Sequence, residues 1–362
     1  MVRSFFGLRF LLALSVLLVH LPFPREKAFG VLIDSLFNNA GFAVTFFFIL
    51  SGFCTALGYS EKFDTFNKNV FLNYYKKRIV KIYPLYIFTS IWALTASLIL
   101  LHSLKDIFHF SFAFLLSATL LQSWTIKYFS VMNGASWFIS TIFFCYLCTP
   151  FLILFSKNFT WIKNISAIFI CLFIYAILLF LANPLEANFK LALLYCSPYS
   201  RIFHYAIGLF LGNLFLQKKF FIKKSVFEII ACLLCGFAFL FNSVFKIDQT
   251  NQITNLIYIP VIAFCIFVFA HELGICTKIL KTKAFQYFGK FSMEIYLIHY
   301  VVIFFGFGTL LSKIPFLERH LFFKNILLVF ITLVISILWK KFYASARNTF
   351  LFSHNFVKMK IK

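Results

Sequence analysis

Residues 42–57 read FAVTFFFILSGFCTAL and contain no charged side chain. Two further blocks, residues 5–21 and 82–101, are almost as apolar. Each block approaches the ~20 apolar residues that a helix needs to cross the hydrocarbon core of a bilayer. This pattern predicts an all-α, polytopic integral membrane protein.

The composition of the whole chain agrees with that prediction. Of its 362 residues, 62% are hydrophobic and 12% are charged, and the mean hydropathy is +0.91. A soluble domain has about 25% charged residues. There is no low-complexity linker and no internal repeat, so residues 1–362 are predicted to form a single transmembrane domain without a separate soluble domain. No small-residue cleavage site follows the first block, and we expect that block to be retained rather than removed as a signal peptide.

The apolar blocks predict about ten transmembrane helices. The expected spans are residues 5–22, 41–59, 83–101, 137–156, 161–182, 201–217, 226–243, 253–270, 290–307 and 324–343. The stretch 108–122 is apolar but short, and we expect it to be a re-entrant or interfacial helix.

The positions of the positive charges predict the orientation. With ten spans, 23 of the 34 Lys and Arg residues fall on the N-terminal side of the membrane and 10 on the opposite side. Lys and Arg concentrate in short cytoplasmic loops, so both termini are predicted to be cytoplasmic. If 108–122 crossed, the basic clusters at 218–224, 278–290 and 340–362 would lie outside. Topology accounts for the net charge of +23, and no nucleic acid partner is expected.

Nine cysteines are scattered through the apolar blocks. Two pairs, 145/148 and 232/235, have the CxxC spacing of metal and redox sites, but that spacing is weak evidence without its structural context. Because free cysteine packs as a small hydrophobic side chain, we expect packing roles and no metal.

Two ionisable residues occupy the first span. Arg9 and His20 are eleven residues apart, which is about three helical turns, so they face nearly the same side about 16 Å apart. One helix therefore offers a cation at its cytoplasmic end and an imidazole at its outer end. Both could also snorkel to the interfaces. His299 is predicted to lie deeper, where an ionisable residue is expected to be functional.

A basic cluster precedes the third span. Residues 74–84 read YYKKRIVKIYP, with Lys77, Arg78 and Lys81 among the cations. The cluster can be ordinary anchoring to anionic lipid at the cytoplasmic face. It can also bind phosphate groups, since clustered Lys and Arg side chains form strong hydrogen bonds with them. Pro84 suits the first turn of the helix that follows.

Several segments together carry a resemblance to a known family. In chain order, the segments are Arg9 with His20, residues 46–53 (FFFILSGF), 77–86 (KRIVKIYPLY), 136–138 (SWF), 206–212 (AIGLFLG) and 292–299 (SMEIYLIH). With them the chain resembles the acyltransferase-3 family of bacterial membrane O-acyltransferases. The segments span nearly the whole chain.

The resemblance implies that an acyl group, usually acetyl from acetyl-CoA, passes to a sugar hydroxyl of a surface or exported glycan at the bacterial inner membrane. It implies that acyl-CoA is a co-substrate, not a permanently bound cofactor. Expected partners are acyl-CoA, a glycan or lipid-linked sugar and membrane lipids. By the same analogy His20 is catalytic, as a general base or as an acyl carrier. Acyl-CoA binding is expected at Arg9, Lys77, Arg78 and Lys81, and substrate or structural support at Ser136, Trp137, Tyr296 and His299.

The chain departs from the family pattern at three places. Thr45 stands where Asp is common, the fourth span lacks a Glu, and Lys81 replaces the second Arg of an Arg-x-x-Arg pattern. The carboxylate that would orient the catalytic His is therefore unassigned. Two rival functions are a transporter or flippase for a lipid-linked glycan or small molecule, and a scaffold without catalysis. Transporters often contain internal repeats and broken helices, whereas this chain has no repeat and few Gly and Pro.

Overall fold

The computed structural model describes residues 2–22, 39–99, 103–220, 222–245 and 252–360, and only the backbone of 242–245 and 347–360. In this part of the chain every regular element is helical, which confirms the all-α prediction. The longer helices are α1 (Ser4–His20), α3 (Ala40–Tyr59), α4 (Lys68–Ile99), α5 (Leu104–Ala118), α6 (Trp137–Ser156), α7 (Trp161–Leu181), α9 (Pro198–Leu216), α10 (Val226–Phe245), α11 (Asn255–Phe269), α14 (Ser292–Phe304) and α17 (Leu321–Lys360).

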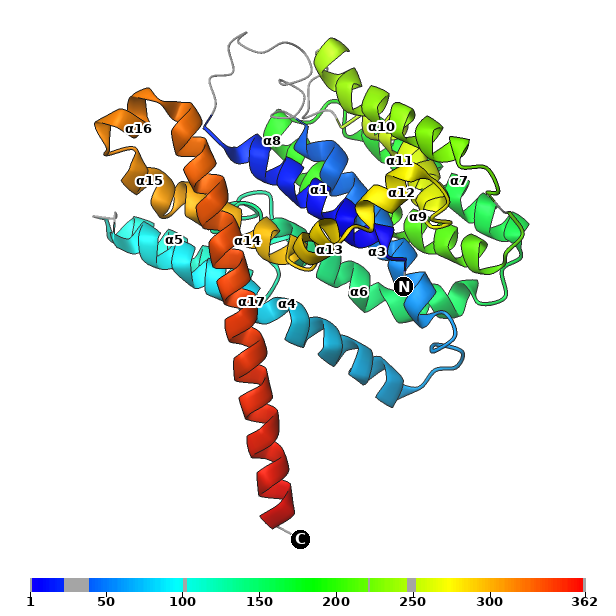
Figure 1. Ribbon diagram of the computed structural model, residues 1–362, viewed down its shortest axis with the longest axis horizontal. Helices are drawn as coiled ribbons and strands as arrows, with labels where there is room; N and C mark the ends of the chain where they lie inside the picture. The colour runs from blue at the N-terminus through cyan, green and yellow to red at the C-terminus, as the bar shows by residue number, and fades with distance from the viewer. Residues whose placement is uncertain (1, 23–38, 100–102, 221, 246–251, 361–362) are drawn as a thin grey trace.

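Shorter helical segments connect the long ones. They are the 3-10 turn η1 (Gln122–Trp124), α8 (Ala187–Lys190), the π-helical η2 (Leu191–Cys196), α12 (Ile275–Leu280), α13 (Lys283–Gly289), α15 (Phe307–Leu311) and α16 (Pro315–Arg319). Figure 1 shows α1 and α3 inside the bundle, with α10 and α11 together on one side and α4 and α5 on the other.

Each predicted span coincides with one helix, and five helices are long and apolar enough to cross a membrane. These five are α3, α4, α6, α7 and residues Leu321–Ala346 of α17. Four shorter apolar helices are Ser4–His20, Val226–Phe241, Asn255–Phe269 and Ser292–Phe304. The chain is therefore a multi-pass membrane protein, while the count of ten spans and the cytoplasmic termini stay predictions.

The start of the helix that contains the third span was predicted wrongly. Helix α4 begins at Lys68, so Pro84 lies inside the helix and not in its first turn. Residues 68–82, which precede the predicted span, are held by aromatic packing. The ring of Tyr74 lies 4.8 Å from that of Tyr59 and 5.3 Å from that of Phe63. A proline costs the helix one hydrogen bond, and this packing offsets the loss.

Helix α5 corresponds to the stretch expected not to cross. It has 15 residues, which is short for a transmembrane helix. It packs along α4, where the hydroxyls of Tyr83 and Tyr86 donate to the carbonyl oxygens of Ala118 and Ser117. These contacts hold the C-terminal end of α5 against the middle of α4, and Figure 1 shows the two helices side by side.

Helix α3 is the centre of the core and packs most closely on α9. A Cβ at Gly208 would overlap the carbonyl oxygen of Ile49, and a Cβ at Gly52 would overlap that of Tyr205. The two backbones therefore touch without intervening side chains, as is common where helices associate in membranes. This contact fixes α3 relative to the segment from residue 191 to 216.

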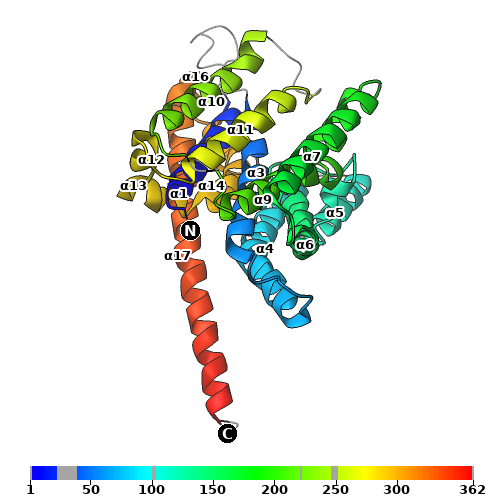
Figure 2. The ribbon, with the colours of Figure 1, turned by 90° about the vertical axis from the view of Figure 1, so that its right-hand side faces the viewer.

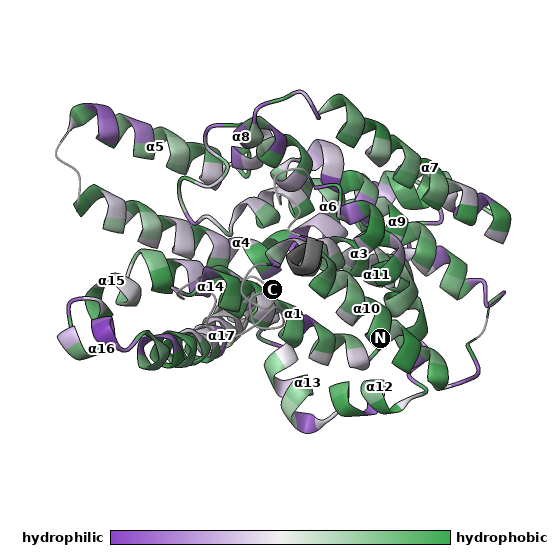
Figure 3. Ribbon diagram, turned by 90° about the horizontal axis from the view of Figure 1, so that it is seen from above, coloured by the Kyte–Doolittle hydropathy of each residue, from purple (hydrophilic) through white to green (hydrophobic). Residues whose placement is uncertain are grey.

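The outer surface is apolar where lipid is expected. On α7, Phe169, Phe173 and Phe180 are each at least 65% exposed. Figure 3 shows hydrophobic helices with polar residues mainly at turns and helix ends, for instance around α13 and α16. Figures 1 and 2 both show α17 extending well beyond the rest of the bundle.

Labelling of single cysteines tests the orientation. In a variant without the nine native cysteines, we expect an external, membrane-impermeant reagent to modify Asn183→Cys but not Lys219→Cys, both of which replace exposed residues. The reason is that a non-crossing α5 places residue 183 outside and residue 219 in the cytoplasm. The opposite labelling pattern would refute the ten-span topology.

Substitution at the helix contact tests the packing. We expect Gly208→Val to reduce the yield of folded protein and to destabilise it by at least ~1–3 kcal/mol, because the new side chain overlaps the backbone of α3. Gly236→Val on α10 is the matched control, since a Cβ there has no neighbour within 4 Å. Thermal unfolding in detergent gives the comparison, and equal melting temperatures for the two variants would contradict this account.

Candidate active site

The imidazole of His20 lies at the C-terminal end of α1. Pro22 disfavours helical geometry in the preceding residue, and Leu21 is indeed extended, with ψ at 142°. The helix therefore ends at His20, as its sequence dictates. The carbonyl oxygen of Pro22 accepts a hydrogen bond from the side chain of Asn325 at 3.1 Å, which ties this end of α1 to α17.

Two histidines from different helices meet at this end. The His20 Nδ1 lies 2.8 Å from the carbonyl oxygen of Val16, and the His299 Nδ1 lies 3.1 Å from that of Ile295. A carbonyl oxygen only accepts, so both Nδ1 atoms carry hydrogen. The Nε2 of neutral His299 lies 3.3 Å from the His20 Nδ1 and shares the same hydrogen as a second, weaker acceptor. This arrangement leaves the lone pair of His20 on Nε2, free for chemistry.

Backbone carbonyls, and not a carboxylate, orient both rings in the described part of the chain. The Nδ1 atom of each histidine donates to the backbone carbonyl oxygen four residues earlier on the same helix, so each helix sets the ring of its own histidine. His299 is fully buried and lies behind His20, whereas His20 is half-buried. The carboxylate that the sequence left unassigned is not found among the described hydrogen-bond partners of either ring.

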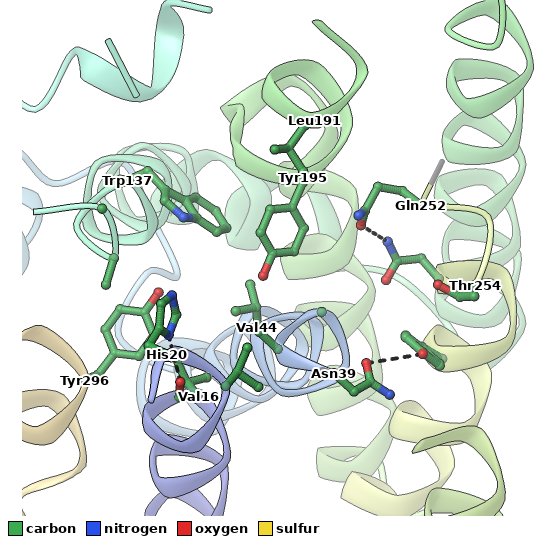
Figure 4. A pocket seen from close by; sticks show the side chains of 17 residues that line it. Val16, His20, Asn39, Val44, Trp137, Leu191, Tyr195, Gln252, Thr254 and Tyr296 are labelled. Atoms are coloured by element: carbon green, nitrogen blue, oxygen red, sulfur yellow. Dashed lines mark hydrogen bonds between the residues drawn. The ribbon is translucent and has the colours of Figure 1, made fainter. Parts of the chain in front are cut away.

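His20 borders a cavity of about 210 Å³, which we call the outer cavity after the predicted orientation (Figure 4). Figure 4 shows its ring beside Tyr296, with Trp137 and Tyr195 facing the same space. The other polar lining consists of amide, hydroxyl and phenol groups, from Asn39, Gln252, Thr254, Asn255 and Tyr258. Among the described residues no Lys, Arg, Asp or Glu lines this cavity. The described part of its wall is therefore polar but uncharged, apart from the titratable His20.

The turn before α6 places Trp137 in the cavity wall. Asn133 donates to the carbonyl oxygen of Leu297 at 2.8 Å and accepts from the Ala135 backbone N–H, which pins the turn to α14. Ser136 is buried but does not line the cavity, and its carbonyl oxygen accepts from Gln122. The structure thus places Trp137 at the site and Ser136 in its supporting framework.

A second, larger cavity of about 470 Å³ lies toward the other end of α1, and we call it the inner cavity. Three cations line it, namely Arg9 from α1 and both Arg78 and Lys81 from α4. Among the described residues, none of these three forms an ion pair with a carboxylate within 4 Å. The cavity is therefore electropositive and suited to an anionic ligand.

Aromatic rings hold Arg78 in place. Its guanidinium carbon lies 4.4 Å from the ring centroid of Tyr146, 5.0 Å from that of Tyr74 and 5.5 Å from that of Tyr59. Its Nε is buried and has no hydrogen-bond partner in the described structure. Stacking on rings attracts the cation without neutralising its charge, so the guanidinium can still bind an anion.

Lys77 is not brought to this cavity. It is exposed, and it does not line the inner cavity, although it is adjacent to Arg78 in the sequence. Neighbouring residues on a helix point about 100° apart, so one can face the cavity while the next faces away. The predicted group of four cations is therefore a group of three at the cavity, with Lys77 outside it.

Tyr296 borders both cavities. It is buried on α14, and its ring centroid lies 5.1 Å from that of Phe138 and 6.1 Å from that of Phe47. The two cavities thus meet at one aromatic side chain, with cations on one side of it and His20 on the other. Tyr296 was predicted as a support residue, and its position is at the junction.

Sequence reasoning missed a buried arginine behind the outer cavity. Arg201 is fully buried and donates to the carbonyl oxygen of Tyr195 at 2.7 Å and to the Thr45 hydroxyl at 3.1 Å. Thr45 in turn donates to Asn255, which lines the cavity. Arg201 is one of the ten Lys and Arg residues that the ten-span prediction places on the side opposite the N-terminus. Its one sequence signal is its place at the very start of an apolar span.

The cysteine pairs form no metal site in the described part of the chain. In the described ranges no group of three His, Cys, Asp or Glu side chains could hold a metal ion. The Cys232 and Cys276 sulfur atoms lie 3.4 Å apart as free thiols.

Comparison with known proteins gives one match. A family model described as an acyltransferase domain matches residues 3–342. No curated protein and no solved structure matches the chain. The matched range includes all the residues that border the two cavities, apart from Val2.

The electropositive cavity predicts anion binding through Arg78. We expect coenzyme A to raise the melting temperature of the detergent-solubilised protein, and Arg78→Gln to raise the required concentration about tenfold or more, because a charged hydrogen bond contributes ~1.5–3 kcal/mol. Lys77→Ala should have a smaller effect. Lys163→Gln, at an exposed position on α7, is the control. The same coenzyme A dependence for Arg78→Gln and the control would count against this site.

Proposed function

The chain belongs to the acyltransferase-3 family of membrane proteins, and from this premise we propose that it moves an acetyl group from cytoplasmic acetyl-CoA to a hydroxyl of a surface or exported glycan. The proposed location is the bacterial inner membrane. The observation that carries the proposal is the pair of cavities that meet at Tyr296, one lined by cations and the other by His20.

The inner cavity suits the donor. Coenzyme A carries several phosphate charges on its nucleotide end, and Arg9, Arg78 and Lys81 offer cations without carboxylate partners. Arg in particular can bind phosphate oxygens in a bidentate manner. With the nucleotide at these residues, the pantetheine arm extends along α1 toward Tyr296. Arg9 and His20 are about 16 Å apart along the helix, so an extended arm delivers the thioester near the histidine.

The outer cavity suits an uncharged sugar. Amide groups of Asn39, Gln252 and Asn255 both donate and accept hydrogen bonds, as sugar hydroxyls do. The ring of Trp137 offers an apolar surface against which a sugar face packs. The uncharged lining of the described wall favours a neutral acceptor over one that carries a carboxylate or phosphate at this point.

His20 supplies the base. A sugar hydroxyl is a poor nucleophile near neutral pH, and an imidazole lone pair can take its proton as the new bond forms. The free lone pair is on Nε2, because Nδ1 donates to Val16. The acceptor oxygen then bonds to the thioester carbonyl carbon, the carbon–sulfur bond breaks, and the coenzyme A thiolate takes the proton from His20. In this role His299 fixes the position of His20 from behind.

Replacement of His20 tests the function. In cells that lack the chain, we expect wild-type protein to restore the acetyl mass on surface glycans, measured by mass spectrometry. His20→Ala should lower acetylation ~10²–10⁴-fold, since that is the usual loss on removing a general base. His299→Ala should impair it less, because His299 acts through His20.

The controls separate catalysis from folding. His320→Ala replaces an exposed histidine outside both cavities and should acetylate normally. Membrane levels of each variant and protection by coenzyme A show whether the donor site persists. Near-normal glycan acetylation by His20→Ala would remove the catalytic assignment, and wild-type protein that restores no acyl mass would refute the proposed function.

A further inference from the structure

Arg201 on α9 is a buried cation without a carboxylate partner. No part of its surface is exposed, and within the described chain it forms no ion pair. Its Nε donates to the carbonyl oxygen of Tyr195 at 2.7 Å, and its Nη1 donates to Thr45. Its Nη2 has no hydrogen-bond partner among the described residues. The guanidinium is therefore held in place by neutral groups, and its charge is not cancelled.

The neighbouring histidine does not change this charge. His204 approaches the carbonyl oxygen of Ser200 through Nδ1 at 3.2 Å, so Nδ1 carries hydrogen. Its Nε2 then accepts from Nη1 of Arg201 at 3.2 Å, which requires a neutral imidazole. Burying a cation costs several kcal/mol when no anion compensates it. A cost of this size is expected where the charge serves a function.

Tyr195 lies between Arg201 and the outer cavity. The guanidinium carbon of Arg201 is 4.8 Å from the centroid of the Tyr195 ring. The ring itself borders the cavity and packs against Trp137, with 4.9 Å between ring centroids. Figure 4 shows its hydroxyl pointing into the space that His20 also borders. In the described structure this hydroxyl makes no hydrogen bond, so it is available to a bound molecule.

Acyl transfer creates a negative oxygen at this place. When a hydroxyl attacks a thioester, the carbonyl oxygen becomes an oxyanion, which then collapses as the carbon–sulfur bond breaks. A hydrogen-bond donor aimed at this oxygen stabilises the transition state, and it does so more strongly in a site that excludes water. The oxyanion forms whether His20 acts as base or carries the acyl group.

Resting on the proposed function, we propose that the Tyr195 hydroxyl is the donor to this oxyanion and that Arg201 is its positioning residue. Arg201 fixes the backbone of Tyr195 through the 2.7 Å hydrogen bond. Its charge beside the ring also stabilises electron density that the hydroxyl gains from the oxyanion. Tyr296 also borders the site, but among the described residues no Lys or Arg stacks on its ring, so Tyr195 is the stronger donor.

Removing one hydroxyl tests the proposal. Inside-out membrane vesicles that contain the native acceptor are given radiolabelled acetyl-CoA, and the initial rate of transfer to glycan is measured. We expect Tyr195→Phe to lower kcat about 100-fold, as loss of an oxyanion donor does. The KM for acetyl-CoA should stay within about threefold of wild type, because the lost interaction exists only in the transition state.

The control is Tyr83→Phe. It removes a phenol hydroxyl of similar burial that donates to Ala118 and borders neither cavity. We expect the transfer rate of this variant to equal that of wild type. A Tyr195→Phe rate within about threefold of wild type, or a larger loss in Tyr296→Phe than in Tyr195→Phe, would overturn the assignment.

A double-mutant cycle tests the role of Arg201. Arg201→Gln should lower kcat in the wild-type background and have little further effect in the Tyr195→Phe background, because the two residues act as one unit. Fully additive losses would mean that Arg201 does not act through Tyr195. If Arg201→Gln does not reach the membrane, the rate of Tyr195→Phe alone decides the proposal. Vesicles with wild-type protein that transfer no label would refute the proposed function instead, so the two failures are distinct.

Discussion

Cations that are held by rings and neutral oxygens, and not by carboxylates, are the feature on which both cavities depend. Arg78 lies among three tyrosine rings at the inner cavity, and Arg201 lies against Tyr195 behind the outer one. A carboxylate partner would hold either side chain more tightly but would also cancel its field at short range. Aromatic rings attract a cation while leaving its charge available to other groups. The chain has 22% aromatic residues, and these two sites show one use of them.

The position of His20 depends on helix ends in a similar way. One proline fixes where α1 stops, and the last turn of that helix supplies the carbonyl oxygen that selects the tautomer. His299 is oriented by its own helix in the same manner. Because each ring is set by local backbone, the pair needs only the packing of α1 on α14 to bring the two histidines together. The contact between α3 and α9 at Gly52 and Gly208 fixes the position of α3, which forms another part of the outer cavity wall.

Much of the fold could be predicted because apolar length is a direct signal. Every expected span coincides with a helix, and the common side of Arg9 and His20 follows from helical geometry alone. The packing of distant segments was not predictable. Arg201 is buried because η2 and α3 close over it, which no local pattern of residues 191–216 indicates. Lys77 and Arg78 are neighbours in sequence, but the orientation of α4 turns Arg78 toward the inner cavity and Lys77 away from it. The continuation of α4 through Pro84 likewise rests on tertiary aromatic contacts.

The junction at Tyr296 also bears on the electrical insulation of the membrane. The proposed location, a bacterial cytoplasmic membrane, stores energy as a proton gradient, and a continuous water-filled path through a protein would dissipate it. In the proposed reaction, two cavities that share a buried ring would let a flexible thioester arm reach from one to the other without a column of water across the bilayer. Under that proposal, the Tyr296 ring between donor and acceptor would also block a continuous path of water. A smaller side chain at position 296 would widen the passage between the two cavities and would also let ions through more easily.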